Sequence, residues 1–229
     1  MYPLKLFIFL LLLCSNSFAQ VTQLQFKAKF GSEDLIVGEH SFKSAEGEEI
    51  QISGLKFYCS NIRFWQDETI IWEEGNSFHL VDCSTLTTSI ISFGQKINAT
   101  FNRVSFDLGI DSITNTSGAM GGDLDPTKGM YWTWQSGYIN FKLEGKHPLC
   151  TAVSKEFQFH LGGYQYPYQS LQTVNLKVKK QNSIIIYLNI EEVLKHIDWI
   201  KKSSIMSPCA ESVLLAQKVA QAFSTTLTR

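Results

Sequence analysis

Hydrophobic and polar side chains alternate along much of this chain, which is the pattern of β-strands that bury one face. Gly, Asn and Asp interrupt the alternating runs and supply turn signals between them. The alternating and shorter β-like runs lie at 24–30, 55–64, 78–81, 104–110, 139–143, 157–161, 174–178 and 184–190. Short strands separated by turns in this way predict an all-β protein, an antiparallel β-sandwich.

A helical pattern is confined to the C-terminal end of the chain. Asn189 and Glu192 form a capping-box pattern ahead of a first helix over about 190–202. Ser207 and Pro208 are typical of the N-cap and first turn of a second helix. The apolar stripe expected on that second helix is Leu215, Val219 and Phe223. We therefore expect one or two C-terminal helices that plug or flank the sandwich, within a single domain spanning 20–229.

The first twenty residues have the features of an export signal. Lys5 precedes the apolar run 6–13, and residues 17–19 offer a small-x-small cleavage site. This run is shorter than the roughly 20 residues that span a bilayer. Cys14 follows the bulky Leu13, whereas a lipid-attachment cysteine follows a small residue. We expect residues 1–19 to be a cleaved signal peptide and the mature protein to be soluble, without a transmembrane segment, in the periplasm or at the outer surface.

Composition and charge narrow the classes of partner. The 229 residues are 44% hydrophobic and 18% charged, which is the composition of a folded globular protein. The 20 basic and 21 acidic residues give a net charge of −1 and form no Lys/Arg cluster. Proteins that bind nucleic acid carry a basic patch, so nucleic acid is excluded as a partner.

Four cysteines follow the expected signal peptide: Cys59, Cys83, Cys150 and Cys209. An even number in an exported protein favours disulfides over a metal or redox site, and no C-x-x-C spacing is present. Three pairings are conceivable. We prefer Cys59 with Cys83 and Cys150 with Cys209, because the first two flank one expected hairpin.

The segment 109–145 carries the most unusual sequence. A loop of small residues leads into Trp132 and Trp134, which would present both indoles on one face if they lie on a strand. Ordinary packing and an aromatic site framed by the loop are both consistent with this pattern. A carbohydrate- or peptide-binding platform is a further interpretation, built from Tyr131, Trp132, Trp134, Tyr164, Tyr166 and Tyr168.

Candidate metal ligands are few. His79 and His160 each lie opposite apolar neighbours on an expected strand, so each needs a polar partner or acts as a ligand. Asp123 and Asp125, with Asp107 or Asp111, offer oxygen ligands for calcium, although Asp-x-Asp-Pro is more typical of a turn. No G-x-S-x-G elbow, P-loop or zincin helix is present, so the sequence indicates a protein without catalytic activity.

The block 122–145, GDLDPTKGMYWTWQSGYINFKLEG, resembles the MbnP-like family of exported bacterial proteins. Segments 54–63, 78–82 and 159–163 support the resemblance in the same order along the chain. The resemblance implies copper acquisition or handling, because relatives bind Cu(I) through histidines and a tryptophan oxidised to kynurenine. It also implies an MbnH-like di-haem enzyme as the partner that installs this oxidation.

Carried over to this chain, the resemblance makes His79 and His160 the metal-ligand candidates and Trp132 or Trp134 the oxidised residue. The expected function is therefore a non-catalytic copper-binding protein. The alternative is a surface or periplasmic ligand-binding or structural module that keeps the fold without a metal.

Overall fold

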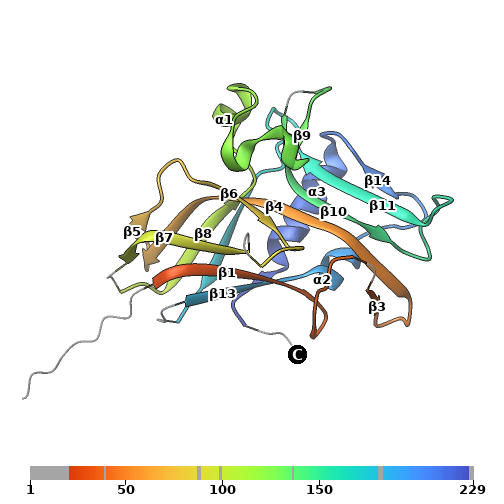
Figure 1. Cartoon of the computed structure of the whole chain (residues 1–229), viewed down its shortest axis with the longest axis horizontal. Helices are drawn as coiled ribbons and strands as arrows, with labels where there is room; N and C mark the ends of the chain where they lie inside the picture. The colour runs from red at the N-terminus through yellow and green to blue at the C-terminus, as the bar shows by residue number, and fades with distance from the viewer. Residues whose placement is uncertain are drawn as a thin grey trace, which may run out of the picture.

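The computed structural model describes residues 21–38, 40–86, 89–97, 100–135, 137–179 and 183–226. The expected signal peptide, residues 1–19, lies outside the described residues. Strands dominate the structure and form two sheets that pack face to face, with helices near the C-terminal end (Figure 1). The predicted fold class, an all-β sandwich with C-terminal helices, is confirmed.

The smaller sheet is built around the first strand, β1. One edge of β1 pairs with β13, and the other edge pairs with β7 and β2. The strand β15 pairs with the far edge of β13. The strands of this sheet are β1 (Val21–Phe30), β2 (Glu33–Asp34), β7 (Ile90–Ile97), β13 (Ser183–Asn189) and β15 (Phe223–Ser224). β1 and β13 are parallel, which corrects the expectation of a purely antiparallel sandwich. They lie far apart in sequence, so no hairpin fixes their relative direction.

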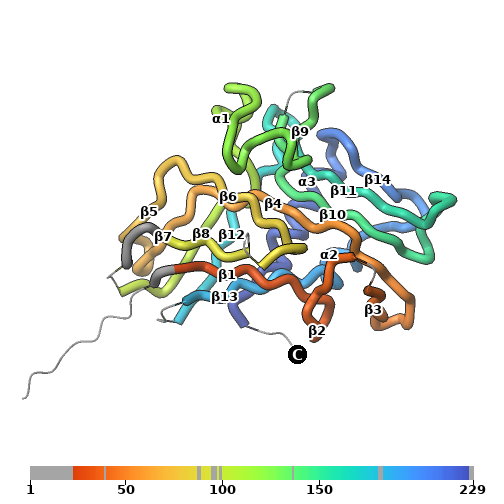
Figure 2. Tube along the Cα trace, in the orientation of Figure 1, coloured from red at the N-terminus to blue at the C-terminus, as the bar shows by residue number. Residues whose placement is uncertain are grey.

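The larger sheet is organised by the long strand β4 (Glu49–Gln66). Successive parts of β4 pair with β10, β6, β8 and β5, and a bulge at Asn61, whose φ is 50°, bends it midway. Further from β4, the strand β11 pairs with β10 and the strand β12 pairs with β8 (Figure 2). The other strands are β3 (Ser41–Lys43), β5 (Thr69–Glu73), β6 (Phe78–Asp82), β8 (Arg103–Leu108), β9 (Tyr131–Trp132), β10 (Gly137–Lys146), β11 (Glu156–Gly162), β12 (Gln172–Lys177) and β14 (Ser204–Ile205).

Two apolar cores follow from this arrangement. The main core lies between the sheets, where Phe26 makes edge contacts with Phe57 and Phe106 at ring-centroid distances of 5.3 and 5.5 Å. A smaller core lies on the outer face of the larger sheet, where the loop before β10 covers Tyr58, Leu80 and other residues. The larger sheet therefore buries apolar side chains on both faces where the loop covers it.

The helices differ in detail from the sequence expectation. The first C-terminal helix, α2 (Ile190–Leu194), is capped by Asn189 as expected but ends after one turn and a half. The second, α3 (Ala210–Gln221), begins later than predicted, with Cys209 as N-cap in place of Ser207. Short helices α1 (Ser112–Thr116), η1 (Gly122–Leu124) and η2 (Pro126–Lys128) lie in the loop of small residues. Within the described residues no helix is long and apolar enough to cross a membrane.

The predicted disulfides are not present, because all four described cysteines carry free thiols. Cys59 lies opposite His79 in the β4–β6 pair, whereas the Cys83 amide bonds the carbonyl of Leu55. Four residues of strand, about 13 Å, therefore separate Cys59 from Cys83, beyond the reach of a disulfide. Cys150 and Cys209 are free thiols too, so the expected bridge between them is not formed; Cys150 instead donates to the carbonyl of Glu156 at 3.0 Å.

Candidate functional site

The loop 109–130 crosses the outer face of the larger sheet and is held there by two buried tyrosines. The Tyr58 hydroxyl donates to the carbonyl of Asp123 at 3.0 Å. The Tyr138 hydroxyl accepts from the Met120 amide at 2.9 Å and donates to the carbonyl of Leu124 at 3.1 Å. Because the backbone of the loop is bonded to side chains of β4 and β10, its small residues adopt a defined path above the sheet.

The start of this loop is fixed by a contact that only glycine allows. Gly109 has a φ of +123°, and a Cβ there would lie 2.3 Å from Cγ of Asn140. The Asn140 side chain accepts from the Ile110 amide at 3.0 Å and donates to the Ser170 hydroxyl at 2.9 Å. The loop, β10 and the segment after β11 therefore converge at one end of the sheet.

Trp132 lies at this end and is almost fully buried, with 3% of its surface exposed. A Cβ on Gly162 would come within 2.6 Å of Cζ3 and 2.8 Å of Cη2 of Trp132, so the indole packs directly against the glycine of β11. Among the described residues, the Trp132 indole nitrogen finds no hydrogen-bond partner. A buried donor without an acceptor costs free energy, and an unpaired donor of this kind needs an explanation.

Trp134 does not share the environment of Trp132. The strand β9 ends at Trp132, so Trp134 lies in the turn that follows and is 63% exposed. The two rings are nevertheless neighbours, with centroids 5.8 Å apart and planes tilted by 44°. The sequence expectation that both lie on one strand face is corrected: one indole is buried and the other extends to the surface.

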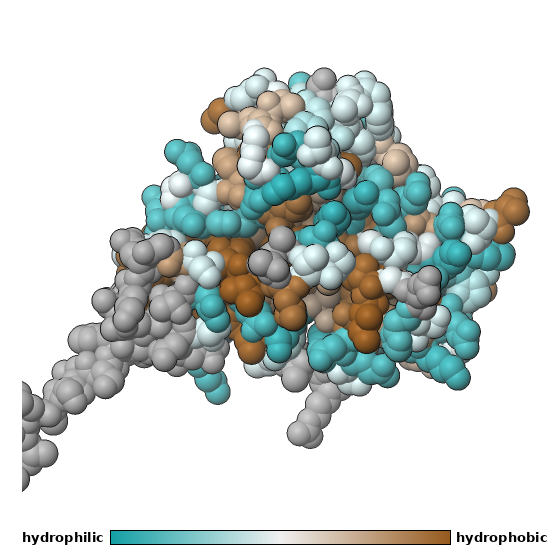
Figure 3. All heavy atoms as spheres, in the orientation of Figure 1, coloured by the Kyte–Doolittle hydropathy of each residue, from teal (hydrophilic) through white to brown (hydrophobic). Residues whose placement is uncertain are grey.

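A hollow of about 420 Å³ opens beside Trp132. It brings together the two aromatic segments that the sequence separates by some thirty positions. We call it the Trp132 pocket; its lining residues are Trp132, Gln135, Gly137, Gly163, Tyr164, Gln165, Tyr166, Pro167, Tyr168 and Pro208. None of these described lining residues carries a charged side chain. Pale colours of weakly polar residues predominate at this end of the molecule, which carries α1 and β9 at the top of Figure 3.

The aromatic platform suggested by the sequence is thus partly assembled. Tyr164, Tyr166 and Tyr168 line the pocket with Trp132. Tyr131 instead packs on Tyr138 at 4.9 Å, within the smaller core. The spacing of the three tyrosines was the signal in the sequence for this platform. Nothing in the sequence indicated the packing role of Gly162 and Gly163, which let Trp132 and the tyrosine segment approach β11.

His160 lies near this site and is paired with a carboxylate. Its Nε2 is 2.7 Å from Oε1 of Glu144, and the side chain is 9% exposed. The hydrogen bond from His160 outweighs burial and, with Lys142 nearby, holds the pKa of Glu144 below its ordinary value. Gly162 is two residues further along β11, so His160 shares the strand face that the Trp132 indole covers.

His79 is also paired, in a different part of the molecule. Its Nε2 lies 2.8 Å from Oε2 of Glu74, in the turn between β5 and β6. Burial works against ionisation of Glu74, but the hydrogen bond and charge of His79 lower the pKa of this carboxyl. The expectation that each histidine needs a polar partner is therefore confirmed for both His79 and His160.

The structure does not bring His79 and His160 together. His79 lies opposite Cys59 of β4, whose side chain is in the main core. His160 lies opposite Lys142, which lies opposite Lys56 of β4. Lys56 and Cys59 are three residues apart, so they and their cross-strand partners face opposite sides of the sheet. Three inter-strand spacings, each about 4.8 Å, further separate the two histidines.

A copper site built on both histidines does not fit this geometry. Metal–imidazole bonds are roughly 2 Å long, and two rings on opposite faces of a sheet cannot reach one ion. Within the described residues, no group of three or more His, Cys, Asp or Glu side chains could hold a metal ion. The imidazole that lies near a candidate tryptophan is that of His160.

A calcium site in this segment is not supported either, because its aspartates cap helices or pair with other groups of the protein. Asp111 caps α1 and Asp125 caps η2. Asp123 accepts from the Leu80 amide at 3.1 Å and pairs with Lys128 at 2.6 Å. The interpretation of this segment as a series of turns and caps is confirmed.

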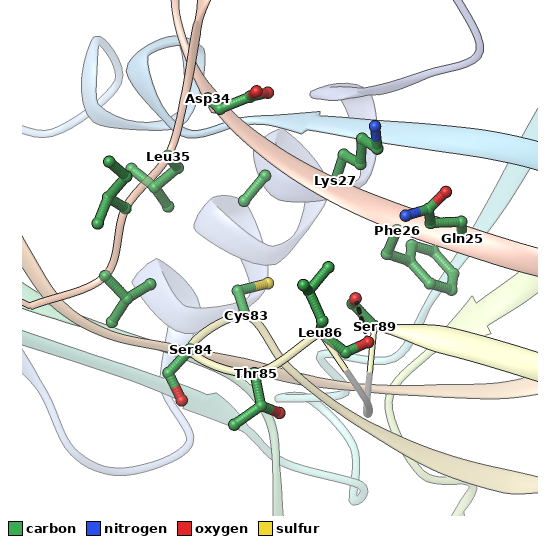
Figure 4. A pocket seen from close by; sticks show the side chains of 13 residues that line it. Gln25, Phe26, Lys27, Asp34, Leu35, Cys83, Ser84, Thr85, Leu86 and Ser89 are labelled. Carbon is green, nitrogen blue, oxygen red and sulfur yellow. Dashed lines mark hydrogen bonds between the residues drawn. The ribbon is translucent and has the colours of Figure 1, made fainter.

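A second hollow, of about 510 Å³, lies between β1 and the segment that follows β6 (Figure 4). The Cys83 side chain is part of its wall, next to Phe26 and Leu86. Burial and the neighbouring Asp82 raise the pKa of Cys83 to about 12. The thiol is therefore protonated at neutral pH and is a poor nucleophile or metal ligand.

Comparisons with known proteins agree with the resemblance seen in the sequence. The MbnP family model matches residues 19–207. Among solved structures, MbnP from Methylosinus trichosporium superimposes with a TM-score of 0.55, covering 84% of this chain and 86% of that one. The identity is 12%, so this likeness concerns the fold. No curated protein sequence gives a significant match.

Proposed function

Because the chain belongs to the MbnP family, we propose that it is an exported, non-catalytic binding protein whose ligand occupies the Trp132 pocket. The observation that carries this proposal is the convergence of Trp132 with the tyrosines of 163–168 around an uncharged hollow. Its volume of about 420 Å³ lies in the range of small-molecule sites, which are concave and lined mainly by apolar and aromatic groups.

The polar groups of the pocket support binding. Within the described part of the chain, the hydroxyls of Tyr164, Tyr166 and Tyr168 make no hydrogen bond. Groups without protein partners at a concave site are available to a ligand.

The absence of charged side chains among the lining residues supports a role without catalysis. General acid–base chemistry needs a group that titrates near the working pH. The lining residues are Trp, Tyr, Gln, Gly and Pro. Export is supported by the family match, which begins at residue 19, where the expected signal peptide ends.

Small organic probes locate the binding site whatever the natural ligand is. Phenol and dioxane are titrated into the protein while the indole N–H resonances of its five tryptophans are followed by NMR. We expect saturable shifts for Trp132 and Trp134 and none for Trp65 or Trp199. Shifts centred on Trp199, or no saturable shift at all, would show that the Trp132 pocket is not the binding site.

Copper handling is a second candidate, favoured by family membership and by one observation. His160 and Trp132 share the outer face of β11. Such a site would use the His160 imidazole and an oxidised Trp132, modified by an MbnH-like di-haem partner, whereas His79 lies on the opposite face. A Cu(I) titration distinguishes the roles: His160→Gln should abolish binding and His79→Gln should leave it unchanged. Wild-type protein that retains no Cu(I) would eliminate this candidate.

A further inference from the structure

We infer that the Trp132 pocket binds a neutral sugar unit of an oligosaccharide, an inference that rests on the proposed function of this pocket as the ligand site. Nothing in the family match specifies this ligand. It follows from three properties of the pocket: aromatic walls, free groups that both donate and accept hydrogen bonds, and no formal charge.

The aromatic walls suit the C–H faces of a sugar ring. Aromatic rings carry negative charge density on their faces and attract polarised C–H groups placed over them. Trp132, 3% exposed, closes the back of the pocket, and the half-buried Tyr164 lines its side. Tyr168, 41% exposed, contributes a further ring.

The hydrogen-bonding groups match hydroxyls. A sugar hydroxyl donates one hydrogen bond and accepts others, so it needs partners of both kinds. The carboxamides of Gln135 and Gln165 each offer a carbonyl oxygen and an NH₂ group, and no hydrogen bond to either is found in the described residues. Tyrosine hydroxyls have the same dual capacity.

The uncharged lining disfavours charged ligands. Phosphates, carboxylates and acidic sugars are most often recognised through Arg or Lys side chains, and none of the described residues that line this pocket is Arg or Lys. A cationic ligand would need a carboxylate, which is likewise absent from the lining residues. The ligand class that remains is neutral and polar.

The rim of the pocket extends the aromatic surface. Trp134 is 63% exposed beside Trp132, and Tyr166 is 90% exposed at the pocket edge. Tyr and Trp are enriched at binding interfaces because each joins a large apolar ring to a polar group. They provide stacking positions for sugar units next to the one in the pocket, which favours an oligosaccharide over a monosaccharide.

A proline-rich peptide is the nearest competitor, because such peptides also bind aromatic grooves. Proline has no backbone N–H, so a run of prolines presents acceptors only. It would leave the carbonyl oxygens of Gln135 and Gln165 without donors. The dual hydrogen-bonding capacity of the pocket therefore favours the sugar.

The test uses neutral oligosaccharides of glucose, xylose, mannose and N-acetylglucosamine, a proline decapeptide and a sulfated glycan, each titrated into the full mature chain. The indole resonances of Trp132 and Trp134 are the readout. We expect one neutral oligosaccharide to shift both signals saturably. Tyr166→Ala should weaken that binding about two- to tenfold, the equivalent of one aromatic contact, and should leave the fold intact because the side chain is exposed.

Ile113→Ala serves as the matched control, since Ile113 is 78% exposed at the same end of the molecule but does not line the pocket. It should bind the oligosaccharide as the wild type does. Shifts caused by phenol and dioxane but by no neutral oligosaccharide, or by the proline peptide alone, would overturn the sugar inference and leave the site in place. Loss of the phenol and dioxane shifts as well would overturn the proposed function itself.

Discussion

The buried indole of Trp132 is closely packed, and its N–H group has no partner in the part of the chain that the structure describes. Replacing it by phenylalanine removes the unpaired donor and keeps most of the apolar contact. We expect Trp132→Phe to lower the free energy of unfolding by no more than about 1 kcal/mol, and Trp132→Ala to lower it by about 3–5 kcal/mol. Urea denaturation of both variants measures this. Equal losses would mean that the N–H group contributes to stability.

Gly162 provides the surface on which Trp132 lies. An added Cβ would stand 2.6 Å from the indole and 2.7 Å from the carbonyl oxygen of Tyr138. Gly162→Ala should therefore destabilise the protein by about 1–3 kcal/mol, the usual cost of overpacking. In Gly121→Ala, the matched control, the Cβ meets nothing within 4 Å and the backbone is extended, so stability should not fall. A tolerated Gly162→Ala in thermal unfolding would contradict this packing.

The burial of His147 leads us to expect that the stability of the protein depends on pH. Its ring is 2% exposed, stacks on Trp199 at 3.9 Å and accepts from the Leu149 amide through Nδ1. Burial lowers the pKa of His147 although Glu48 acts in the opposite direction. The unfolded chain binds a proton near pH 6.5, whereas the folded chain does so only at lower pH.

Below about pH 6.5 the unfolded state thus binds more protons, and stability should fall as the pH falls; above it the contribution of His147 is fully present. Urea unfolding between about pH 7.5 and 5.5 measures the slope, which should be shallower in His147→Gln. His196→Gln, at an exposed position, should keep the wild-type slope. An unchanged slope in His147→Gln would rule out this residue as its origin.

At the level of elements, the position of the loop 109–130 depends on hydrogen bonds to Tyr58 and Tyr138, the two tyrosines beneath it. Tyr138→Phe would leave the Met120 amide and the Leu124 carbonyl without their partner. We expect a loss of about 1–3 kcal/mol in the free energy of unfolding and faster hydrogen exchange at Met120. Tyr187→Phe is the control, because no hydrogen bond of the Tyr187 hydroxyl occurs in the described residues. Unchanged exchange at Met120 would show that the loop is anchored otherwise.

The strands and α3 could be predicted because their patterns are local. Alternation located the cores of β1, β8, β10, β11 and β12, and the stripe of Leu215 and Val219 located α3. Pairing direction and register depend on distant segments, so the parallel pairing of β1 with β13 was not predictable. The same holds for Cys59 and Cys83, whose separation follows from the β4–β6 register.

At the scale of the whole molecule, the sheet has a loop-covered face and a core face. The sequence shows that His79 and His160 each have apolar neighbours on a strand. It does not show that the two lie on opposite faces of one sheet, because this depends on how β6, β4, β10 and β11 pair. Their partners, Glu74 and Glu144, come from separate turns and strands and carry no motif. The aromatic cluster was accessible to sequence reasoning only as a list of tyrosines and tryptophans.

We therefore propose that ligand binding takes place at the aromatic end of the molecule, and not at a copper site shared by His79 and His160, which lie on opposite faces of the sheet. Metal analysis and intact mass of the protein purified from its native host test this most directly. We predict substoichiometric copper and an unmodified peptide around Trp132 and Trp134. Stoichiometric copper together with added oxygen on that peptide would contradict this assignment and establish copper handling as the function.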